Sequence, residues 1–418
     1  MRFVIIFSLF VLSFNTRATT STTPYTPIVF VHGMLASSDT WVNPYVNFRN
    51  AGYSENDLYF LDWNTMSMNS PMTVQQLDSL VNHIIESTGK KKVNLVGHSA
   101  GGGICSSYLS DKKRAKKIDK YVHLASMPIE NTPAVATLNL YSPDDKITGG
   151  KDYSGVTNKA ISGLDHYEIA TSKQSFEAMF QFFNPGGKLE LTVPESASQY
   201  TISGRVCTLG DNSPEKNAQV EIYSFNKRSG ARESQTPIHV LTTDENGYFP
   251  AILLNADTYY EFMVTSLDKS KRKVHYYREP FSNNNPLVYL RTMPSSGFAG
   301  FLLKSLPQNE DEACLAIFSS NKAILFGRDN LSVQGLDLAR KDITPDSKTA
   351  IALFIFDEGS DKESSGMGVQ TFKSFPFMNG VDYFLSVEEN PIELNFNGRR
   401  MNVAPVKSSD GIMVVVFD

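Results

Sequence analysis

The sequence has few cysteines, no excess of positive charge and few long apolar runs, and each shortage excludes a class of protein. Its 418 residues include three cysteines, Cys105, Cys207 and Cys314, too few for a disulfide scaffold. The odd number leaves at least one thiol free, and a bridge between Cys207 and Cys314 stays an open alternative. The formal net charge is −5. Because no broad basic surface is expected, we expect no nucleic-acid partner.

The long apolar run of the sequence lies at its N-terminus, in "MRFVIIFSLFVLSFNTRATTSTTPY". Arg2 is followed by an apolar run over 3–14, and Ala18 ends a plausible cleavage site. The run is shorter than the ~20 residues that a membrane-spanning helix needs. We therefore expect 1–18 to be a signal peptide and the mature protein to be secreted, or periplasmic in a bacterium. An uncleaved anchor is the alternative. We expect no transmembrane helix in the mature chain.

Residues 19–187 carry the pattern of an α/β domain. The segments that resemble strands are "IVFVHG", "DLYFLDW", "VNLVGHS", "YVHLASM", "TLNLYS" and "NKAISG". Between them, residues 73–88 carry apolar side chains at helical spacing. Near-continuous apolar strands are typical of a parallel sheet that is covered on both faces. We predict a doubly wound, mostly parallel sheet.

Beyond this domain the pattern changes to mainly antiparallel β structure. Polar and turn residues over 188–199 predict a linker. We predict a β-sandwich domain over 200–292 and a second β-rich domain over 293–418. Segments typical of strands are "QVEIYS", "YYEFMVTS", "KVHYYRE", "TAIALFIFDE", "DYFLSVEE" and "GIMVVVFD". Asn397-Gly398 predicts a two-residue hairpin, and "TTDENGYFPAILL" predicts a turn that enters a strand.

One stretch indicates a catalytic residue. The segment "NLVGHSAGGG" places Ser99 in a Gly-x-Ser-x-Gly turn between an expected strand and an expected helix. Such a turn holds the serine in a strained backbone with its hydroxyl above the sheet. We expect side chains at Gly97 and Gly101 to collide with neighbouring backbone. The context predicts that Ser99 is a nucleophile.

A serine nucleophile needs a base and an orienting carboxylate, which follow in the order Ser, acid, His in this fold. His166 lies in a loop after an expected strand and is the candidate base. Asp144 and Asp145 compete for the acid role in "YSPDDKIT", and the loop position favours Asp145. We interpret Asp165 as a solvated loop acid.

Two backbone amides are candidates for the oxyanion hole. The amide of Ala100 lies at a helix N-terminus, where an anion is favoured. The amide of Met34 follows the turn at His32-Gly33, and we interpret His32 as a structural residue of that loop. The sequence has no cluster with metal-ligand spacing and no dinucleotide-binding motif after a strand, so we expect no metal and no cofactor.

Together, "FVHGMLAS", "GHSAGG", "YSPDDKIT" and "GLDHYEIA" resemble the motifs of compact secreted lipases and esterases of the α/β-hydrolase superfamily. The resemblance covers about residues 27–185. It implies a minimal α/β-hydrolase core without a large lid insertion, since only 128–136 lies where many lipases carry a lid. It also implies a triad of Ser99, Asp145 and His166, supported by the motif residues His32, Gly33, Gly97, His98 and Gly101. The stretch after residue 200 resembles transthyretin-like or carboxypeptidase-regulatory β-sandwich modules.

The expected function is therefore that of a secreted serine carboxylic-ester hydrolase, a lipase that acts on acylglycerols through an acyl-enzyme on Ser99. The β-rich part would assist substrate binding, and contact with a lipid surface is a further expectation. The segments 62–73 and 297–307 are candidates for acyl-chain contact or ordinary packing. Alternatives are an acyltransferase or amide hydrolase with the same triad, or a non-catalytic surface-binding protein.

Overall fold

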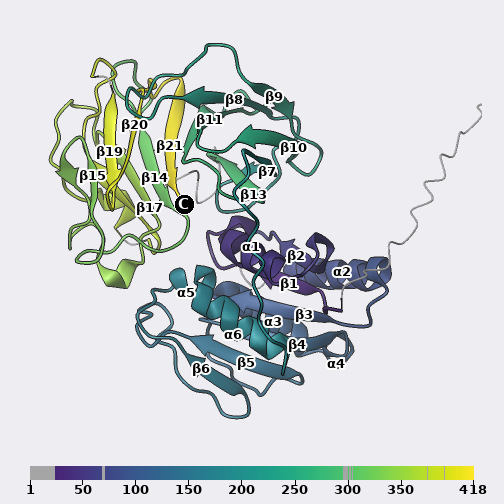
Figure 1. Ribbon diagram of the computed structural model, residues 1–418. Coiled ribbons are helices and arrows are strands. Elements are labelled where there is room, and N and C mark those ends of the chain that lie inside the picture. Colours follow the sequence, from purple (N-terminus) through teal and green to yellow (C-terminus); the bar gives the residue numbers. More distant parts are fainter. Residues whose placement is uncertain are drawn as a thin grey trace, which may run out of the picture.

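The computed structural model describes residues 24–67, 71–294, 300, 303, 305–373, 375–389 and 391–418. The signal peptide predicted at 1–18 lies outside these residues. Figure 1 shows two parts: a sheet with helices in the lower half, and strands in the upper half. We call residues 24–187 the α/β region and residues 199–418 the β-rich region. The residues between them, 188–198, form no helix or strand.

The α/β region is built on a parallel six-stranded sheet in the order β2-β1-β3-β4-β5-β6. Its strands are β1 (Ile28–Val31), β2 (Leu58–Leu61), β3 (Val93–His98), β4 (Ile118–Leu124), β5 (Ala136–Tyr141) and β6 (Thr157–Ala160). Each overlaps one of the apolar segments of the sequence, so the predicted parallel sheet is confirmed. Strands β1 and β3 are buried along their whole length.

Helices cover both faces of this sheet (Figure 1). They are α1 (Val42–Asn50), α2 (Pro71–Thr88), α3 (Ala100–Leu109), α4 (Lys112–Ala115), α5 (Glu168–Thr171) and α6 (Lys173–Phe183), with the 3-10 helices η1 (Ser38–Trp41) and η2 (Glu55–Asp57). Successive strand residues point to opposite faces. Accordingly Ile28 and Phe30 of β1 pack in one core with α1 and α6, whereas Val29 and Val31 pack in a second core with α2 and α3. The helix predicted at 73–88 is confirmed as α2.

The connection between β4 and β5 is short. Residues 125–135 form neither helix nor strand, so the expectation of no large lid insertion at this position is confirmed. Among the described residues, no helix is both long enough and apolar enough to cross a membrane.

The described β-rich region holds three sheets, and most strand pairs in them are antiparallel. The strands are β7 (Gln199–Thr208), β8 (Gln219–Phe225), β9 (His239–Thr242), β10 (Tyr248–Asn255), β11 (Tyr259–Thr265), β12 (Lys273–Arg278), β13 (Asn285–Thr292), β14 (Leu315–Ser319), β15 (Leu331–Val333), β16 (Leu336–Asp337), β17 (Ala352–Phe356), β18 (Met378–Asp382), β19 (Ile392–Phe396), β20 (Arg399–Val403) and β21 (Gly411–Phe417), with the 3-10 helices η3 (Asp346–Lys348) and η4 (Gln370–Phe372). The sheet orders are β10-β7-β13, β16-β15-β19-β20 and β18-β17-β14-β21-β12-β11-β8-β9.

The eight-stranded sheet joins strands from both sides of residue 292. Strand β12 pairs in parallel with β21, from Lys273 opposite Gly411 to Arg278 opposite Val416. One hydrophobic core likewise contains residues of β7 and β11 together with residues of β14 and β17. The two segments of the β-rich region therefore share both a sheet and a core.

Two local predictions in the β-rich region have different outcomes. The hairpin at Asn397-Gly398 is confirmed: it links β19 to β20, and both residues have positive φ, 51° and 85°. The strand predicted over 382–389 is wrong, because β18 ends at Asp382. Beyond Asp382 the backbone makes hydrogen bonds to a loop. For example, the amide of Phe384 donates to Ser364 Oγ at 2.9 Å.

All three cysteines are buried and free. Cys105 lies on α3, as expected. Cys207 packs in the core that α1 and α6 share with the sheet, whereas Cys314 packs in the core of the β-rich region. The alternative of a bridge between Cys207 and Cys314 is therefore wrong.

Candidate active site

The sharp turn between β3 and α3 places Ser99 where parallel strands end. Its backbone has φ 54° and ψ −125°, a region that side-chain-bearing residues rarely occupy and that is held only by surrounding structure. A Cβ atom on Gly97 would lie 2.8 Å from the carbonyl oxygen of Gly101, and one on Gly101 would lie 2.3 Å from the carbonyl oxygen of Val31. The predicted collisions at both glycines are confirmed, and they explain why the turn is crowded with small residues.

A chain of hydrogen bonds joins the three predicted triad residues. Ser99 Oγ donates to His166 Nε2 across 2.9 Å, and His166 Nδ1 donates to Asp145 Oδ2 across 2.8 Å. The histidine and the aspartate are each about 1% exposed. The structure thus brings together three residues from the ends of β3 and β5 and the loop after β6, at distances that allow proton transfer between serine and imidazole.

Asp145 and Asp144 have different partners. Asp145 also accepts hydrogen bonds from the Ile147 amide (2.8 Å) and from Thr148 Oγ1 (2.6 Å). Burial raises the pKa of Asp145, but the bonds from His166, Thr148 and Ile147 outweigh it and lower the pKa to about 2. Asp144 instead accepts from the amide of Gly163 at 2.6 Å. Of the two acids, Asp145 is the one placed against the imidazole, and it is ionised at neutral pH.

The loop after β1 lies directly against the serine. A Cβ atom on Gly33 would lie 2.9 Å from Ser99 Cβ, so the next amide, that of Met34, is close to the turn. Within the described chain, the amides of Met34 and Ala100 donate no hydrogen bond to another residue. The following amide is held, since Leu35 N donates to Thr65 Oγ1 at 3.1 Å. Both candidate oxyanion donors are thus available to a ligand.

The two histidines of the motifs are buried and support these loops. His32 stacks on Trp63, whose indole Nε1 donates to the His32 carbonyl at 3.0 Å. His98 Nε2 donates to the carbonyl of His166 at 2.8 Å. Burial, followed by the electrostatic interaction with His166, lowers the pKa of His98 to about 3, so the ring is neutral. The sequence did not assign this contact, although His98 adjoins Ser99 and could have suggested it.

Comparison with known families agrees with this geometry. Residues 25–139 match the family model for class 2 lipases, residues 198–294 match the lipase C-terminal domain, and residues 318–417 match a further C-terminal domain. The chain resembles the lipases and esterases of the α/β-hydrolase superfamily. The resemblance predicted from the sequence motifs is therefore confirmed.

Individual relatives match parts of this lipase-like chain. It is 34% identical over 126 residues to lipase lipl-5 of Caenorhabditis elegans, a match that covers 24% of this chain and 30% of that lipase. It is 30% identical over 105 residues to lysosomal thioesterase PPT2-B of Xenopus laevis, covering 24% of this chain and 36% of the thioesterase. The chain thus spans about a third of the length of these relatives. Among solved structures, Aspergillus fumigatus lipase B is similar at a TM-score of 0.31 and 14% identity, over 36% of this chain and 52% of that one.

Residues 161–167 form the loop that carries His166, which we call the histidine loop. Contacts from the β-rich region hold this loop in place. Asp165 is 7% exposed, so its interpretation as a solvated loop acid is wrong. Its Oδ2 accepts hydrogen bonds from Arg328 Nη1 and from the amide of Ala323, both at 3.0 Å. Its Oδ1 accepts from the amides of Tyr167 and Glu168. Asp165 therefore ties the loop that carries His166 to a segment more than 150 positions away.

Replacing Arg328 with Gln should loosen this loop. The variant loses the charged hydrogen bond to Asp165, which corresponds to about 1.5–3 kcal/mol of the free energy of unfolding for such bonds. We expect faster amide hydrogen exchange in 163–171, measured by mass spectrometry. Arg340 is a matched control, because it is equally exposed and pairs with Asp342 at 3.0 Å. Equal exchange in Arg328→Gln and Arg340→Gln would contradict this role.

A second prediction concerns the effect of pH on stability. Burial lowers the pKa of His123 to about 4, against the opposing hydrogen bond to the Met127 carbonyl. The unfolded chain then binds a proton near pH 6.5 that the folded chain excludes. Stability should therefore fall as pH drops below about 6.5, by up to about 1.4 kcal/mol per pH unit for this histidine.

Urea unfolding at pH 7.5, 6.0 and 5.0 measures this dependence. His123→Gln should show a smaller loss between pH 7.5 and 5.0 than the natural chain. The control is His83→Gln, which removes an exposed histidine and should leave the slope unchanged. The same slope in all three proteins would refute the prediction.

The segments proposed for acyl-chain contact are only partly described. Met66 is 38% exposed and Met72 is 69% exposed, while residues 68–70 lie outside the described residues. Met66 also lies beside Gly210 of the β-rich region. Of 297–307, the described Leu303 and Leu306 pack in the core of the β-rich region, and 297–299, 301, 302 and 304 lie outside the described residues.

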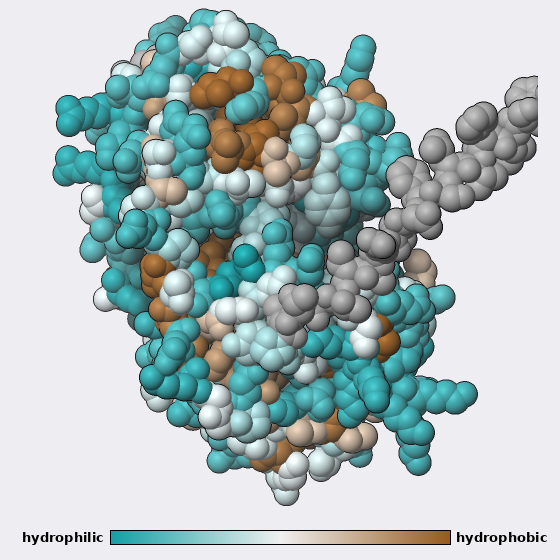
Figure 2. Space-filling model, turned by 45° about the vertical axis from the view of Figure 1, so that its right-hand side comes forward, coloured by the Kyte–Doolittle hydropathy of each residue, from teal (hydrophilic) through white to brown (hydrophobic). Residues whose placement is uncertain are grey.

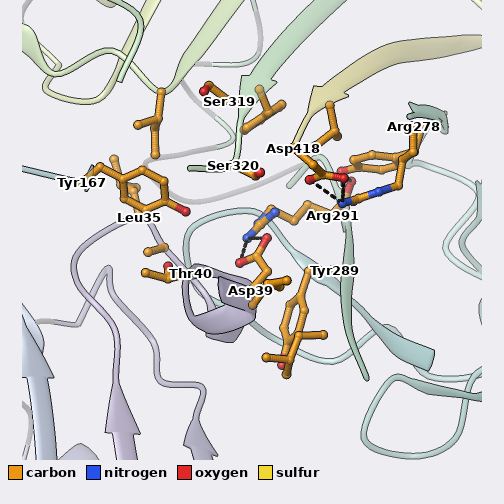
Figure 3. Close-up of a pocket in the computed structure, with 17 residues that line it drawn as sticks. Leu35, Asp39, Thr40, Tyr167, Arg278, Tyr289, Arg291, Ser319, Ser320 and Asp418 are labelled. Atoms are coloured by element: carbon orange, nitrogen blue, oxygen red, sulfur yellow. Dashed lines mark hydrogen bonds and ion pairs between the residues drawn. The ribbon is translucent and has the colours of Figure 1, made fainter. Parts of the chain in front are cut away.

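A cavity of about 60 Å³ lies between the two regions, beside the loops that carry Met34 and His166. Figure 3 shows Leu35 and Tyr167 on one side of it, and two ion pairs within its wall. Arg291 holds both oxygens of Asp39, at 2.6 and 2.7 Å, and Arg278 holds those of Asp418. Its lining does not include the serine, aspartate or histidine of the hydrogen-bonded chain. We interpret this cavity as part of the interface between the α/β region and the β-rich region.

Proposed function

We propose that this protein is a serine hydrolase of carboxylic esters, with Ser99 as nucleophile, His166 as general base and Asp145 as the orienting acid. The observation that carries the proposal is the continuous hydrogen-bonded chain from Ser99 Oγ to the Asp145 carboxylate. This arrangement raises the reactivity of a hydroxyl that is otherwise a weak nucleophile.

Each step of the proposed reaction uses a group described above. Ser99 Oγ attacks the ester carbonyl while its proton passes to His166 Nε2. The amides of Met34 and Ala100 hold the resulting oxyanion, and the helix dipole of α3 favours its charge. The imidazolium then gives its proton to the departing alcohol, which leaves an acyl group on Ser99. A water molecule, deprotonated by His166, releases the acid and restores the serine.

We propose acylglycerols as the substrates and a lipid surface as a contact. Two observations support this: the matches to class 2 lipases and to a lipase C-terminal domain, and the apolar surface of the β-rich region. Figure 2 shows apolar residues gathered on the upper half of the molecule. Within the described β-rich region, Ile238, Val240 and Leu253 have exposed apolar side chains. We also propose secretion, on the basis of the N-terminal sequence alone.

The test uses the full chain with a fluorophosphonate probe and a series of substrates. We expect one covalent adduct, located on Ser99 by mass spectrometry, and hydrolysis of nitrophenyl esters and of emulsified triacylglycerol. A thioester is included, because one relative is a thioesterase, and faster thioester turnover would change the substrate class. No adduct and no turnover of any ester would refute the proposal.

A further inference from the structure

A phenylalanine of the β-rich region lies against the candidate catalytic base. The ring of Phe377 stacks on the imidazole of His166, with centroids 5.8 Å apart and planes inclined by 19°. Phe377 comes directly before β18 and is 7% exposed. The contact therefore links a residue that is distant in sequence to His166, the side chain that transfers protons in the proposed reaction.

The backbone of Phe377 is held in a conformation that a bulky residue rarely adopts. Its φ is +70°, which costs about 1–2 kcal/mol for a residue with a Cβ. Three hydrogen bonds fix it: its amide donates to the Lys348 carbonyl at 3.0 Å, and its carbonyl accepts from the amides of Ile351 at 2.7 Å and Ala352 at 3.1 Å. Strain of this kind persists where surrounding contacts over-determine the backbone. The backbone of Phe377 therefore holds its ring in one position against His166.

The other contacts of His166 do not by themselves fix the tilt of its ring. Its two nitrogens bond to Ser99 and Asp145, and the ring of His98 lies at a centroid distance of 4.9 Å. Two hydrogen bonds in the ring plane do not prevent the ring from tilting about the axis through its nitrogens. A second aromatic ring stacked against the imidazole, as Phe377 is, restricts that tilt.

We propose that Phe377 is a positioning residue for His166: its ring holds the imidazole at the angle at which it bridges Ser99 and Asp145. The inference rests on the proposed ester hydrolysis and adds to it a part of the site that the α/β region does not contain. It assigns to Phe377 a role in the chemical step in addition to packing.

Two variants remove the ring in different ways. Phe377→Ala removes it and keeps the strained backbone, whereas Phe377→Gly removes it and relieves that strain. With nitrophenyl butyrate, we expect kcat to fall about 10- to 100-fold in both, as for a small misplacement of a catalytic group, with KM changed less than about threefold. Phe377→Tyr keeps an aromatic ring and should restore kcat to within about threefold of the natural chain.

The matched control is Met378→Ala. Met378 is the next residue, is equally buried at 7% exposure, and packs in the core of the β-rich region. It should lower the melting temperature while leaving kcat near that of the natural chain. A loss of kcat in Met378→Ala equal to that in Phe377→Gly would show that only the packing of the segment matters, and would overturn the proposal. A change confined to KM would also overturn it, because Phe377 would then contact substrate only.

A readout that needs no turnover separates this inference from the proposed function. The proton between His166 Nδ1 and Asp145 gives a far-downfield proton NMR signal when the ring is held in place. We expect that signal to broaden or vanish in Phe377→Gly and to persist in Met378→Ala and Phe377→Tyr. If esters are not hydrolysed but the signal behaves this way, the proposed function fails and the positioning role stands. An unchanged signal in Phe377→Gly overturns the positioning role.

Discussion

Ser99→Ala is expected to lower kcat for ester hydrolysis by about 10⁶-fold, a loss typical of removing the nucleophile from a triad. The expected loss is large because, in the proposed reaction, neither His166 nor Asp145 can replace the hydroxyl that forms the acyl-enzyme. The substitution removes one oxygen and keeps the Cβ, so it adds no strain at φ 54°. Initial rates with nitrophenyl esters, together with a melting curve, measure the two effects separately.

The control for this variant is Ser107→Ala, which removes an exposed serine from α3, the helix that follows Ser99. It should keep the activity of the natural chain and its fluorophosphonate adduct. The Ser99→Ala protein should keep its melting temperature and lose the adduct. Retention of more than a small fraction of the activity in Ser99→Ala would mean that another group is the nucleophile, and the assignment of the whole chain of hydrogen bonds would fall with it.

Local patterns were sufficient to predict the α/β region and the turn at its centre. A strand, a Gly-x-Ser-x-Gly turn and a helix are adjacent in sequence, and a Cβ atom on Gly97 would collide with that adjacent helix. A Cβ atom on Gly101 would instead collide with Val31 of β1, which is distant in sequence. The acid of the triad was harder to predict, because Asp144 and Asp145 have the same chemistry and lie in the same loop. The structure separates them by their partners: the amide of Gly163 for the first and the imidazole of His166 for the second.

Contacts between distant segments could not be predicted. Asp165 lies next to His166, yet its partner Arg328 is 163 positions away, and no local pattern connects the two. The stack of Phe377 on His166 is of the same kind. Likewise the sequence suggested β12 and β21 as separate strands, but their parallel pairing depends on the fold as a whole.

A second such contact ties the loop of Met34, whose amide is a proposed oxyanion donor, to the β-rich region. Asp62, just after β2, accepts hydrogen bonds from the amide and hydroxyl of Ser38, at 2.9 and 2.7 Å. It also accepts from Arg205 Nη1 at 2.6 Å and from the hydroxyl of Tyr289 at 2.5 Å. The side chains of Asp62 and Arg205 are only 7% and 10% exposed. One buried carboxylate thus holds the end of the loop that contains Met34 and two strands of the β-rich region.

Asp62→Ala is expected to lower the free energy of unfolding by about 3–5 kcal/mol, the usual cost of leaving one member of a buried ion pair without its partner. Arg205 would keep its charge in a site from which water is largely excluded, and Tyr289 would lose its acceptor. Urea unfolding followed by tryptophan fluorescence measures the change, since Trp63 is the next residue. Lys188→Ala is the control, because Lys188 and Glu190 form a pair that is more than two-thirds exposed, and such pairs contribute little.

The double variant Asp62→Leu with Arg205→Leu distinguishes the ion pair from simple loss of packing. If the unpaired charge causes the damage, removing both charges should recover much of the stability that Asp62→Ala loses, because replacing a buried pair with apolar side chains is often neutral. Activity should not recover in parallel, because the amide and hydroxyl of Ser38 still lack their acceptor and the loop that carries Met34 stays loose. Recovery of both stability and kcat would show that Asp62 serves only to neutralise Arg205, and that the loop that carries Met34 keeps its place without Asp62.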